Sequence, residues 1–499
     1  METAQQFRDL VARMKNVEEA INVIFWDLRT GCPKKGVEQR AEVVGMLSGD
    51  LFKLGTSEEM GRYLEELSAP DTLASLDPIT RASVLERKKE YDRSKKIPAD
   101  KYQAYVTLTS KSEFAWQEAK KNNDFNAFAP YLEQIVESLK EFVEIWGYEE
   151  DKYDALVQQY EPEMTARQLD ALFGPLRERT VELVKRIGAK EQVERGFLNQ
   201  QFPEEKQREF SHYILKQLGY DFDAGRLDPS AHPFMIGLNP GDVRVTTRYY
   251  EHDLQMALFA TIHECGHALY EQNVSSELNG TFLATGASMG LHESQSRFWE
   301  NAVGRSKEFW ERFYGDLQAN YPGQFDDVPM EAFYKAVNLV EPSLVRVEAD
   351  ELTYNLHIMI RYEIEKDLIN GVIEVKDLPA VWEAKFEEYL GIKPDNHANG
   401  VLQDIHWTSG AFGYFPTYTL GNIYAAQLEA AMKQQLPNYK DKVREGDFSE
   451  ILGWMTENVH RHGKALSPRE IMKKATGEEL NAAPLIAYLE EKYKTVYGL

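Results

Sequence analysis

Cysteine is scarce in this sequence. Only Cys32 and Cys265 occur among 499 residues. Two thiols cannot build the disulfide framework on which many secreted proteins depend, so we expect a protein of a reducing compartment. The hydrophobic fraction of 43% and the aromatic fraction of 12% are instead those of a globular protein with a sizeable core.

An excess of positive charge is also missing. Lys and Arg total 57 against 81 Asp and Glu, which gives a formal net charge of −24. Nucleic acids and anionic membrane surfaces are bound by basic faces. The charge therefore argues against both as partners and favours solubility.

Long apolar segments are absent as well. No run of 18 apolar residues exists, so nothing in the sequence is expected to span a membrane. The first residues, METAQQFRDLVARMKN, are charged at Arg8, Asp9, Arg13 and Lys15 and do not resemble a secretory signal. We find neither internal repeats nor low-complexity tracts. These features together predict a soluble, cytoplasmic protein.

Helical periodicity dominates what is present. Apolar side chains recur at intervals of three and four residues in two long stretches, which predicts amphipathic helices. These positions are Phe7, Leu10, Val11, Met14, Val17, Ile21 and Ile24, and then Phe128, Tyr131, Leu132, Ile135, Leu139, Phe142 and Trp146. We expect a mostly α-helical fold, with a loop at 68–78, where SAPDTLASLDP contains two prolines.

One segment departs from this pattern. DVRVTTRYY (242–250) is rich in Val, Thr and Tyr and follows Pro240-Gly241, which predicts a strand. Alternate residues of a strand face the same side, so Arg244 and Arg248 would share a face with Asp242, which could pair with Arg244. An exposed edge of this strand could also bind a peptide main chain.

The stretch TIHECGHALYEQ (261–272) follows immediately. His263 and His267 lie four residues apart, about 40° around a helix, so both can point at one metal ion. Glu264 lies about 100° further round, poorly placed as a ligand but well placed to take a proton from an attacking water. Cys265 is expected to be a packed side chain rather than a ligand. The alternative is three polar residues on an ordinary helix, but the apolar LQMALFATI before them predicts that this helix is buried.

A catalytic zinc site needs a third protein ligand and an open position. The segment after His267 lacks the third histidine of the metzincins. LHESQSRFWENAVG (291–304) supplies two carboxylates. We favour Glu293 as the third ligand, and Glu300 is the rival.

Six short stretches resemble the signature motifs of the carboxypeptidase Taq family of metallocarboxypeptidases. They are HPF (232–234), DVRVTTRY (242–249), HECGH (263–267), HES (292–294), VRVEAD (345–350) and GVLQDIHW (400–407). The resemblance implies a nearly all-α fold like that of neurolysin-like peptidases, with a deep groove between two lobes and a small sheet beside the active-site helix. It implies a homodimer that uses zinc or cobalt to release single residues from peptide C-termini with broad specificity.

The resemblance also implies residues and boundaries. The metal ligands would be His263, His267 and Glu293, with Glu264 as general base. Residues 1–499 would form one catalytic domain, with an N-terminal helical lobe over about 1–225, an active-site region over about 230–420 and C-terminal helices over about 420–499.

A carboxypeptidase further needs a cation for the terminal carboxylate of its substrate. Arg346 is our first candidate, although it could instead pair with a nearby acid such as Glu348 or Asp350. Arg244 and Arg248 are the alternatives. His232 could line the closed end of the groove or simply pack.

A donor for the developing oxyanion is expected in HWTSGAFGYFPTY (406–418), which is rich in Gly and aromatic residues. His406, Tyr414 and Tyr418 are the candidates, and aromatic packing is the alternative for each tyrosine. Gln403 and Asp404 are expected to orient His406 or a metal ligand.

Two other functions remain open at this point. An oligo-endopeptidase on the same fold would share the metal chemistry and differ only in the carboxylate anchor. A non-enzymatic helical protein would use HECGH structurally, but structural zinc sites are usually closed by four ligands and often rich in Cys, and only Cys265 is near.

Overall fold

The computed structural model describes residues 2–499 and divides into two compact units. Unit 1 comprises Met1–Lys95, Glu194–Val337 and Leu428–Glu479. Unit 2 comprises Lys96–Val193, Asn338–Gln427 and Leu480–Leu499. Each unit is therefore assembled from three separate stretches of chain, whereas the expected lobes followed the sequence in order. Within 2–499, no helix has both the length and the apolar character that crossing a membrane requires.

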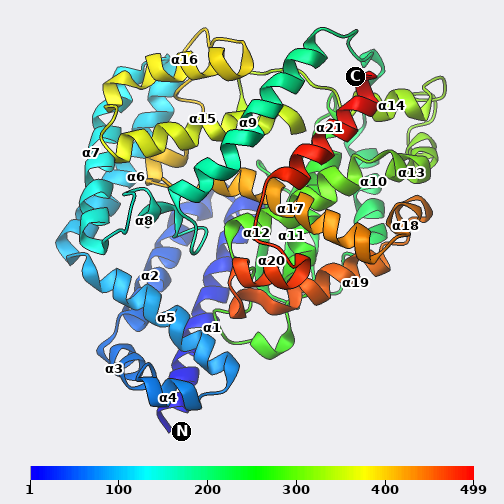
Figure 1. Ribbon diagram of the computed structural model, residues 1–499. Helices are drawn as coiled ribbons and strands as arrows, with labels where there is room; N and C mark the ends of the chain where they lie inside the picture. Colours follow the sequence, from blue (N-terminus) through cyan, green and yellow to red (C-terminus); the bar gives the residue numbers. More distant parts are fainter. Residues whose placement is uncertain (1) are drawn as a thin grey trace. The chain divides into compact units, whose positions relative to one another are not determined.

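Unit 1 is mainly helical (Figure 1), and among the described residues it alone contains strands. Its helices are α1 (Glu2–Thr30), α2 (Val37–Gly55), α3 (Glu58–Leu67), α4 (Pro70–Ser75), α5 (Pro78–Lys96), α10 (Glu204–Gln217), α11 (Leu254–Gln272), α12 (Met289–Arg297), α13 (Lys307–Asn320), α14 (Met330–Ala336), α18 (Tyr439–Glu445), α19 (Ser449–Asn458) and α20 (Pro468–Thr476). Part of its core lies between α1 and α3, where Phe7, Val11 and Met14 pack with Met60 and Leu64. The predicted N-terminal apolar stripe is thus the buried face of α1.

Unit 2 is entirely helical apart from its connecting segments. Its helices are α6 (Ala99–Asn122), α7 (Phe125–Trp146), α8 (Asp154–Val157), α9 (Ala166–Gly188), α15 (Glu351–Ile369), α16 (Leu378–Leu390) and α21 (Ala483–Tyr497). The second predicted stripe lies on α7, which packs against α6. α15 is buried along most of its length and packs against α9 and α16. α17 (Pro416–Gln435) runs from unit 2 into unit 1.

The predicted strand belongs to a sheet of three. β1 (Leu227–Pro229), β3 (Asp242–Thr247) and β2 (Met235–Asn239) lie in that order, with β1 parallel and β2 antiparallel to β3. The Thr247 hydroxyl donates to the main-chain oxygen of Ala257 at 3.3 Å, and it accepts from the Thr261 hydroxyl at 3.0 Å. These contacts attach the sheet to α11, as expected for a sheet beside the HECGH helix.

Two predictions about local structure are wrong. β3 is the central strand, so both of its edges are paired and it has no free edge for a peptide; the sequence of β2 contains Gly237 and did not suggest a strand. Segment 68–78 is not a loop, because it contains α4. Pro70 occupies the first turn of that helix, where its missing N–H would have no helical partner anyway.

Candidate metal centre

Helix α11 carries both histidines of HECGH. The Asp253 side chain caps its first turn by accepting from the main-chain N–H of Met256 at 3.0 Å. The helix is buried on most sides, as the apolar LQMALFATI predicted. His263 and His267 lie one turn apart on it, with their ring centroids separated by 5.0 Å.

Close packing of α12 on α11 brings the third candidate ligand to these histidines. A Cβ added at Gly266 would lie 2.4 Å from the main-chain oxygen of Gln295, so only glycine fits between His263 and His267 at this point. The Ser288 side chain caps α12 by accepting from Leu291 N. The glycine of HECGH therefore has a packing role that the metal motif alone does not reveal.

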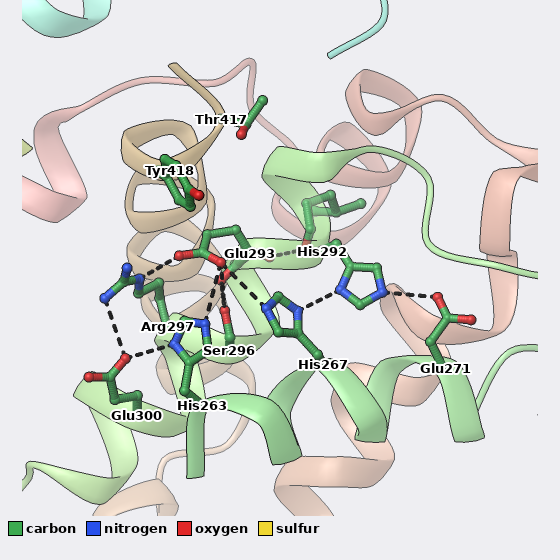
Figure 2. Close-up of polar contacts among 12 residues, drawn as sticks. His263, His267, Glu271, His292, Glu293, Ser296, Arg297, Glu300, Thr417 and Tyr418 are labelled. Atoms are coloured by element: carbon green, nitrogen blue, oxygen red, sulfur yellow. Dashed lines mark hydrogen bonds and ion pairs between the residues drawn. The ribbon is translucent and has the colours of Figure 1, made fainter. Parts of the chain in front are cut away.

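His263, His267 and Glu293 form one cluster (Figure 2). Glu293 Oε2 lies 3.6 Å from His263 Nε2 and 3.5 Å from His267 Nε2. One ligand atom from each residue lies within 4.8 Å of the others. Two imidazole nitrogens and one carboxylate oxygen are a donor set of catalytic zinc sites, so these residues fit a divalent metal.

Glu300 binds the other face of His263 rather than joining the cluster. Its Oε2 lies 2.9 Å from His263 Nδ1. Arg297 approaches both acids, donating to Glu293 Oε1 at 2.6 Å and lying 3.4 Å from Glu300. A carboxylate accepts, so His263 donates from Nδ1 and leaves the Nε2 lone pair facing Glu293. The rival ligand of the sequence analysis thus lies where it orients a ligand.

A second chain of contacts, through His292 to Glu271, fixes the tautomer of His267. His267 Nδ1 lies 2.6 Å from His292 Nδ1, and His292 Nε2 lies 2.9 Å from Glu271 Oε1. Glu271 accepts from His292 Nε2, so in a neutral His292 the Nδ1 atom accepts from His267, and His267 Nε2 keeps its lone pair. Both histidines therefore present unprotonated Nε2 atoms to the same point. In the sequence, His292 stands out only as part of the HES motif, and nothing there suggests this role.

The surrounding charges favour a cation at this point. Burial alone would lower the pKa of His263, but the charge of Glu293 and the hydrogen bond to Glu300 outweigh it and raise that pKa. Burial opposes ionisation of Glu293, yet Arg297 and the two histidines hold its pKa well below the usual range. Burial lowers the pKa of His267 to about 4, which keeps it neutral.

Replacing His292 with Ala should weaken metal binding. The change removes the acceptor that fixes the His267 tautomer, and loss of such an outer partner typically lowers metal affinity about 10–100-fold. Metal-competition titration with a chromophoric chelator measures the effect. The exposed His252 provides the matched control, because His252→Ala should bind metal like the wild type. Equal affinities in all three proteins would contradict a role for His292.

Glu264 lies beside the cluster without joining it. It is 9% exposed, and its carboxylate accepts from the main-chain N–H of Met235 on β2. Burial is the main cause that raises the pKa of Glu264 to about 7. Cys265 is fully buried, as expected for a packed side chain.

Arg346 belongs to a second polar cluster, in unit 2. It is 7% exposed, its Nε donates to Asp404 Oδ1 at 3.0 Å, and its Nη1 donates to the Tyr354 hydroxyl at 3.0 Å. Asp350, one of the partners in the alternative interpretation, instead caps α15 by accepting from the main-chain N–H groups of Leu352 and Thr353.

Asp404 also binds a second arginine, which the sequence motifs do not suggest. Arg361 on α15 is fully buried and donates from Nε to Asp404 Oδ2 at 2.6 Å. Two guanidinium groups thus share one carboxylate, and the three side chains carry a net charge of +1. Gln403 accepts from Arg346 N at 2.9 Å. Gln403 and Asp404 therefore contact Arg346 rather than orienting His406 by hydrogen bonds.

His406 begins a short helical turn, His406–Ser409, in the same unit. Its Nε2 lies 3.3 Å from the Tyr418 hydroxyl, and its ring contacts those of Phe415 and Tyr414 at centroid distances of 4.5 and 5.6 Å. Burial lowers the pKa of His406 to about 4, so the imidazole is neutral. The structure thus brings together Arg346, His406, Tyr414 and Tyr418, which the sequence had only suggested.

His357 makes unit 2 sensitive to acid. It is fully buried, and neither ring nitrogen has a hydrogen-bond partner among residues 2–499. Burial, followed by the charges of Arg361 and Arg346, holds its pKa well below the usual value. The unfolded chain therefore binds a proton as the pH falls below about 6.5 while the folded chain does not. This one group therefore lowers the free energy of unfolding below about pH 6.5, by up to about 1.4 kcal/mol per pH unit, and has no such effect above that pH.

Replacing His357 with Leu should reduce this loss, because Leu has no proton to gain. Thermal unfolding at pH 7.5 and at pH 5.5 tests the expectation. The melting temperature should fall less between the two pH values in His357→Leu than in the wild type. An equal fall would assign the acid sensitivity to other groups.

The remaining candidates lie in or next to the small sheet. Arg244 donates from Nε and Nη2 to the two oxygens of Asp242 at 2.8 and 2.7 Å, so the anticipated pairing is confirmed. Arg248 donates to the main-chain oxygen of Ala231 at 3.0 Å. His232 is exposed.

Comparisons with known proteins agree with this architecture. Residues 6–493 match the family described as carboxypeptidase Taq (M32) metallopeptidase. Carboxypeptidase 1 of Bacillus subtilis (strain 168) is 50% identical over 496 residues, 99% of both chains. Thermostable carboxypeptidase 1 of Thermus thermophilus is 43% identical and covers 95% of this chain and 94% of its own.

The solved structures lead to the same family. The M32 carboxypeptidase of Deinococcus radiodurans R1 has a TM-score of 0.97 at 37% identity, covering 100% of both chains. Trypanosoma cruzi metallocarboxypeptidase 1 has a TM-score of 0.94 at 33% identity and covers 99% of this chain and 100% of its own. The resemblance carried by the six motifs is confirmed, and the oligo-endopeptidase alternative is not favoured. This chain belongs to the carboxypeptidase Taq (M32) metallopeptidase family and is a metal-dependent carboxypeptidase.

Proposed function

We propose that this carboxypeptidase releases single residues from peptide C-termini with broad side-chain tolerance, using one zinc ion held by His263, His267 and Glu293. The observation that carries the proposal is the pair of histidines whose Nδ1 contacts leave both Nε2 lone pairs directed at Glu293. These donors also accept cobalt, which is the alternative metal. When bound, such an ion supplies a Lewis acid that polarises the scissile carbonyl and lowers the pKa of the attacking water.

Glu264 is proposed as the general base. It follows His263 directly on α11 and is not one of the three residues whose ligand atoms cluster, so its carboxylate is available to act on the attacking water rather than to ligate. In this role its carboxylate takes a proton from the attacking water and then delivers it to the leaving amine. Its burial supports the assignment, since the exclusion of water strengthens the electrostatic interactions inside an active site.

Arg346 is proposed to bind the terminal carboxylate of the substrate. The two guanidinium groups on Asp404 leave one positive charge uncompensated within that triad, and a carboxylate would balance it. Such a contact selects the last peptide bond, which makes the enzyme an exopeptidase. Arg244 is a weaker candidate because Asp242 already occupies its fork. Arg248 is a weaker candidate because it is exposed, and His232 remains a candidate only for lining the substrate path.

His406, Tyr414 and Tyr418 are proposed as donors to the developing oxyanion. A neutral imidazole and a tyrosine hydroxyl can each donate one hydrogen bond to the oxyanion. Neither group carries a charge, which would also stabilise the bound substrate before the reaction. The contact between His406 Nε2 and the Tyr418 hydroxyl favours this tyrosine as its partner.

The cellular setting of the enzyme is also a proposal. The family resemblance supports a homodimer. The two cysteines are free thiols, which supports the cytoplasm. One catalytic domain over residues 1–499 is proposed because the family match extends over 6–493 and thus includes stretches of both units.

The exopeptidase assignment is tested with one peptide and its C-terminally amidated twin. The enzyme is loaded with zinc or cobalt, and products are followed over time by mass spectrometry. We expect a ladder of one-residue losses from the free peptide and little cleavage of the amide, which lacks the charge that Arg346 would bind. Equal rates on both peptides would overturn the proposed carboxylate recognition.

A further inference from the structure

A buried carboxylate lies behind the segment that carries His406 and Tyr414. Glu365, on α15 in unit 2, is fully buried. Its Oε1 accepts from the indole Nε1 of Trp407 at 2.7 Å. Its Oε2 accepts from the main-chain N–H of Gly413 at 2.9 Å and from the Tyr153 hydroxyl at 2.6 Å. Trp407 directly follows His406, and Gly413 directly precedes Tyr414.

Two of these three groups can act only as hydrogen-bond donors. An indole N–H and a main-chain N–H only donate, whereas a tyrosine hydroxyl can turn and accept. The two obligatory donors use different oxygens of Glu365, so both are satisfied only by a group with two acceptor atoms. A carboxylate has them and an amide does not.

The far end of the segment is also closely packed. Gly413 has φ +88, and an added Cβ would lie 2.6 Å from the main-chain carbon of Leu156 and 2.7 Å from Val157 N. Between the two ends, the chain closes on itself through Ala411 N donating to His406 O at 3.1 Å and Gly410 N donating to Trp407 O at 3.1 Å. A shift at either contact with Glu365 would therefore displace the residue next to it.

We propose that Glu365 is a positioning residue for peptide hydrolysis, holding both ends of segment 406–415 so that His406 and Tyr414 keep the geometry that the reaction needs. The inference rests on the proposed role of His406 as an oxyanion donor. Glu365 itself touches neither substrate nor metal in this scheme. It acts through Trp407 at one end of the segment and through Gly413 at the other.

The first test is Glu365→Gln, which keeps the size of the side chain and removes one acceptor. We expect kcat to fall about 10²-fold, the effect typical of a displacement of about 1 Å at a reacting centre. KM should change little because Arg346 is untouched, and metal content should equal that of the wild type. Tyr153→Phe is the matched control: it removes a donor to the same carboxylate and leaves the segment attached, so kcat should stay near the wild-type value.

A second variant separates positioning from general damage. Trp407→Phe removes the indole donor, so the one side-chain oxygen that remains in Glu365→Gln can accept from the main-chain N–H of Gly413. We expect the double variant Glu365→Gln/Trp407→Phe to be no slower than Glu365→Gln alone, whereas independent effects would multiply. If Glu365→Gln does not fold, Trp407→Phe alone decides, and it should lower kcat without changing metal content.

The outcomes distinguish this inference from the proposed function. An active wild type with an unchanged kcat in Glu365→Gln, or multiplied effects in the double variant, would overturn the inference alone. A rise in KM with kcat preserved would also overturn it. A wild type that releases no C-terminal residues would overturn the proposed function, and the inference with it.

Discussion

Replacing Glu264 with Gln should nearly abolish peptide hydrolysis while the metal remains bound. Gln keeps the shape and the contact with Met235 N but cannot take a proton, so kcat should fall by about 10²–10⁴-fold, the usual contribution of a general base. Metal content measured on the purified variant should match the wild type, because Glu264 lies outside the cluster of His263, His267 and Glu293. KM should change less than kcat, since the carboxylate acts in the transition state.

The control for this prediction is Glu277→Gln. Glu277 is an exposed glutamate in the same unit, and its loss should leave kcat at the wild-type value. Full hydrolysis by Glu264→Gln with metal bound would assign the base elsewhere. Loss of metal together with activity would instead make Glu264 part of the binding site.

Replacing Arg346 with Lys should remove the preference for a free C-terminus. Lys keeps the charge but loses the planar fork that pairs with a carboxylate. Truncating one partner of a buried charged pair typically costs 2–5 kcal/mol, so kcat/KM on a free peptide should fall about 30- to 4,000-fold. The amidated twin never used this contact, so its rate should change little and the ratio of the two rates should fall towards one.

Arg244→Lys is the matched variant for this second prediction. Each arginine pairs with a carboxylate, Arg346 with the distant Asp404 and Arg244 with Asp242 inside its own strand. If Arg244→Lys removes the preference for the free C-terminus and Arg346→Lys retains it, the terminal carboxylate of the substrate is bound by Arg244 on β3 and not by Arg346. Circular dichroism spectra and metal contents of both variants, compared with the wild type, show whether the fold has changed.

Local patterns accounted for much of the fold. The apolar stripes placed α1 and α7 because a helix repeats every 3.6 residues and its buried face is visible in a single stretch of sequence. The Val- and Thr-rich run similarly located β3. Its place at the centre of the sheet was missed, because β1 and β2 are short and their composition does not stand out.

The cluster of candidate ligands was predictable for the same reason. His263 and His267 belong to one helix turn, and Glu293 occurs in a short motif that accompanies them. Their partners were harder to find. Glu300 was considered only as a rival ligand, and its contact with His263 Nδ1 depends on how the π-helical turn at Phe298–Gly304 follows α12.

By itself, therefore, the sequence determined the helical class, the HECGH helix, the three candidate ligands and, through six motifs, the family. Tertiary structure alone decided which groups hold those residues in place. Asp404 meets Arg346 from 58 residues away, and Glu365 reaches Trp407 across 42. Spacing along a helix is a local property that a sequence displays directly, whereas the partner of a buried charge is set by which distant segments pack together, since a buried ion must find its counter-group wherever the fold places one.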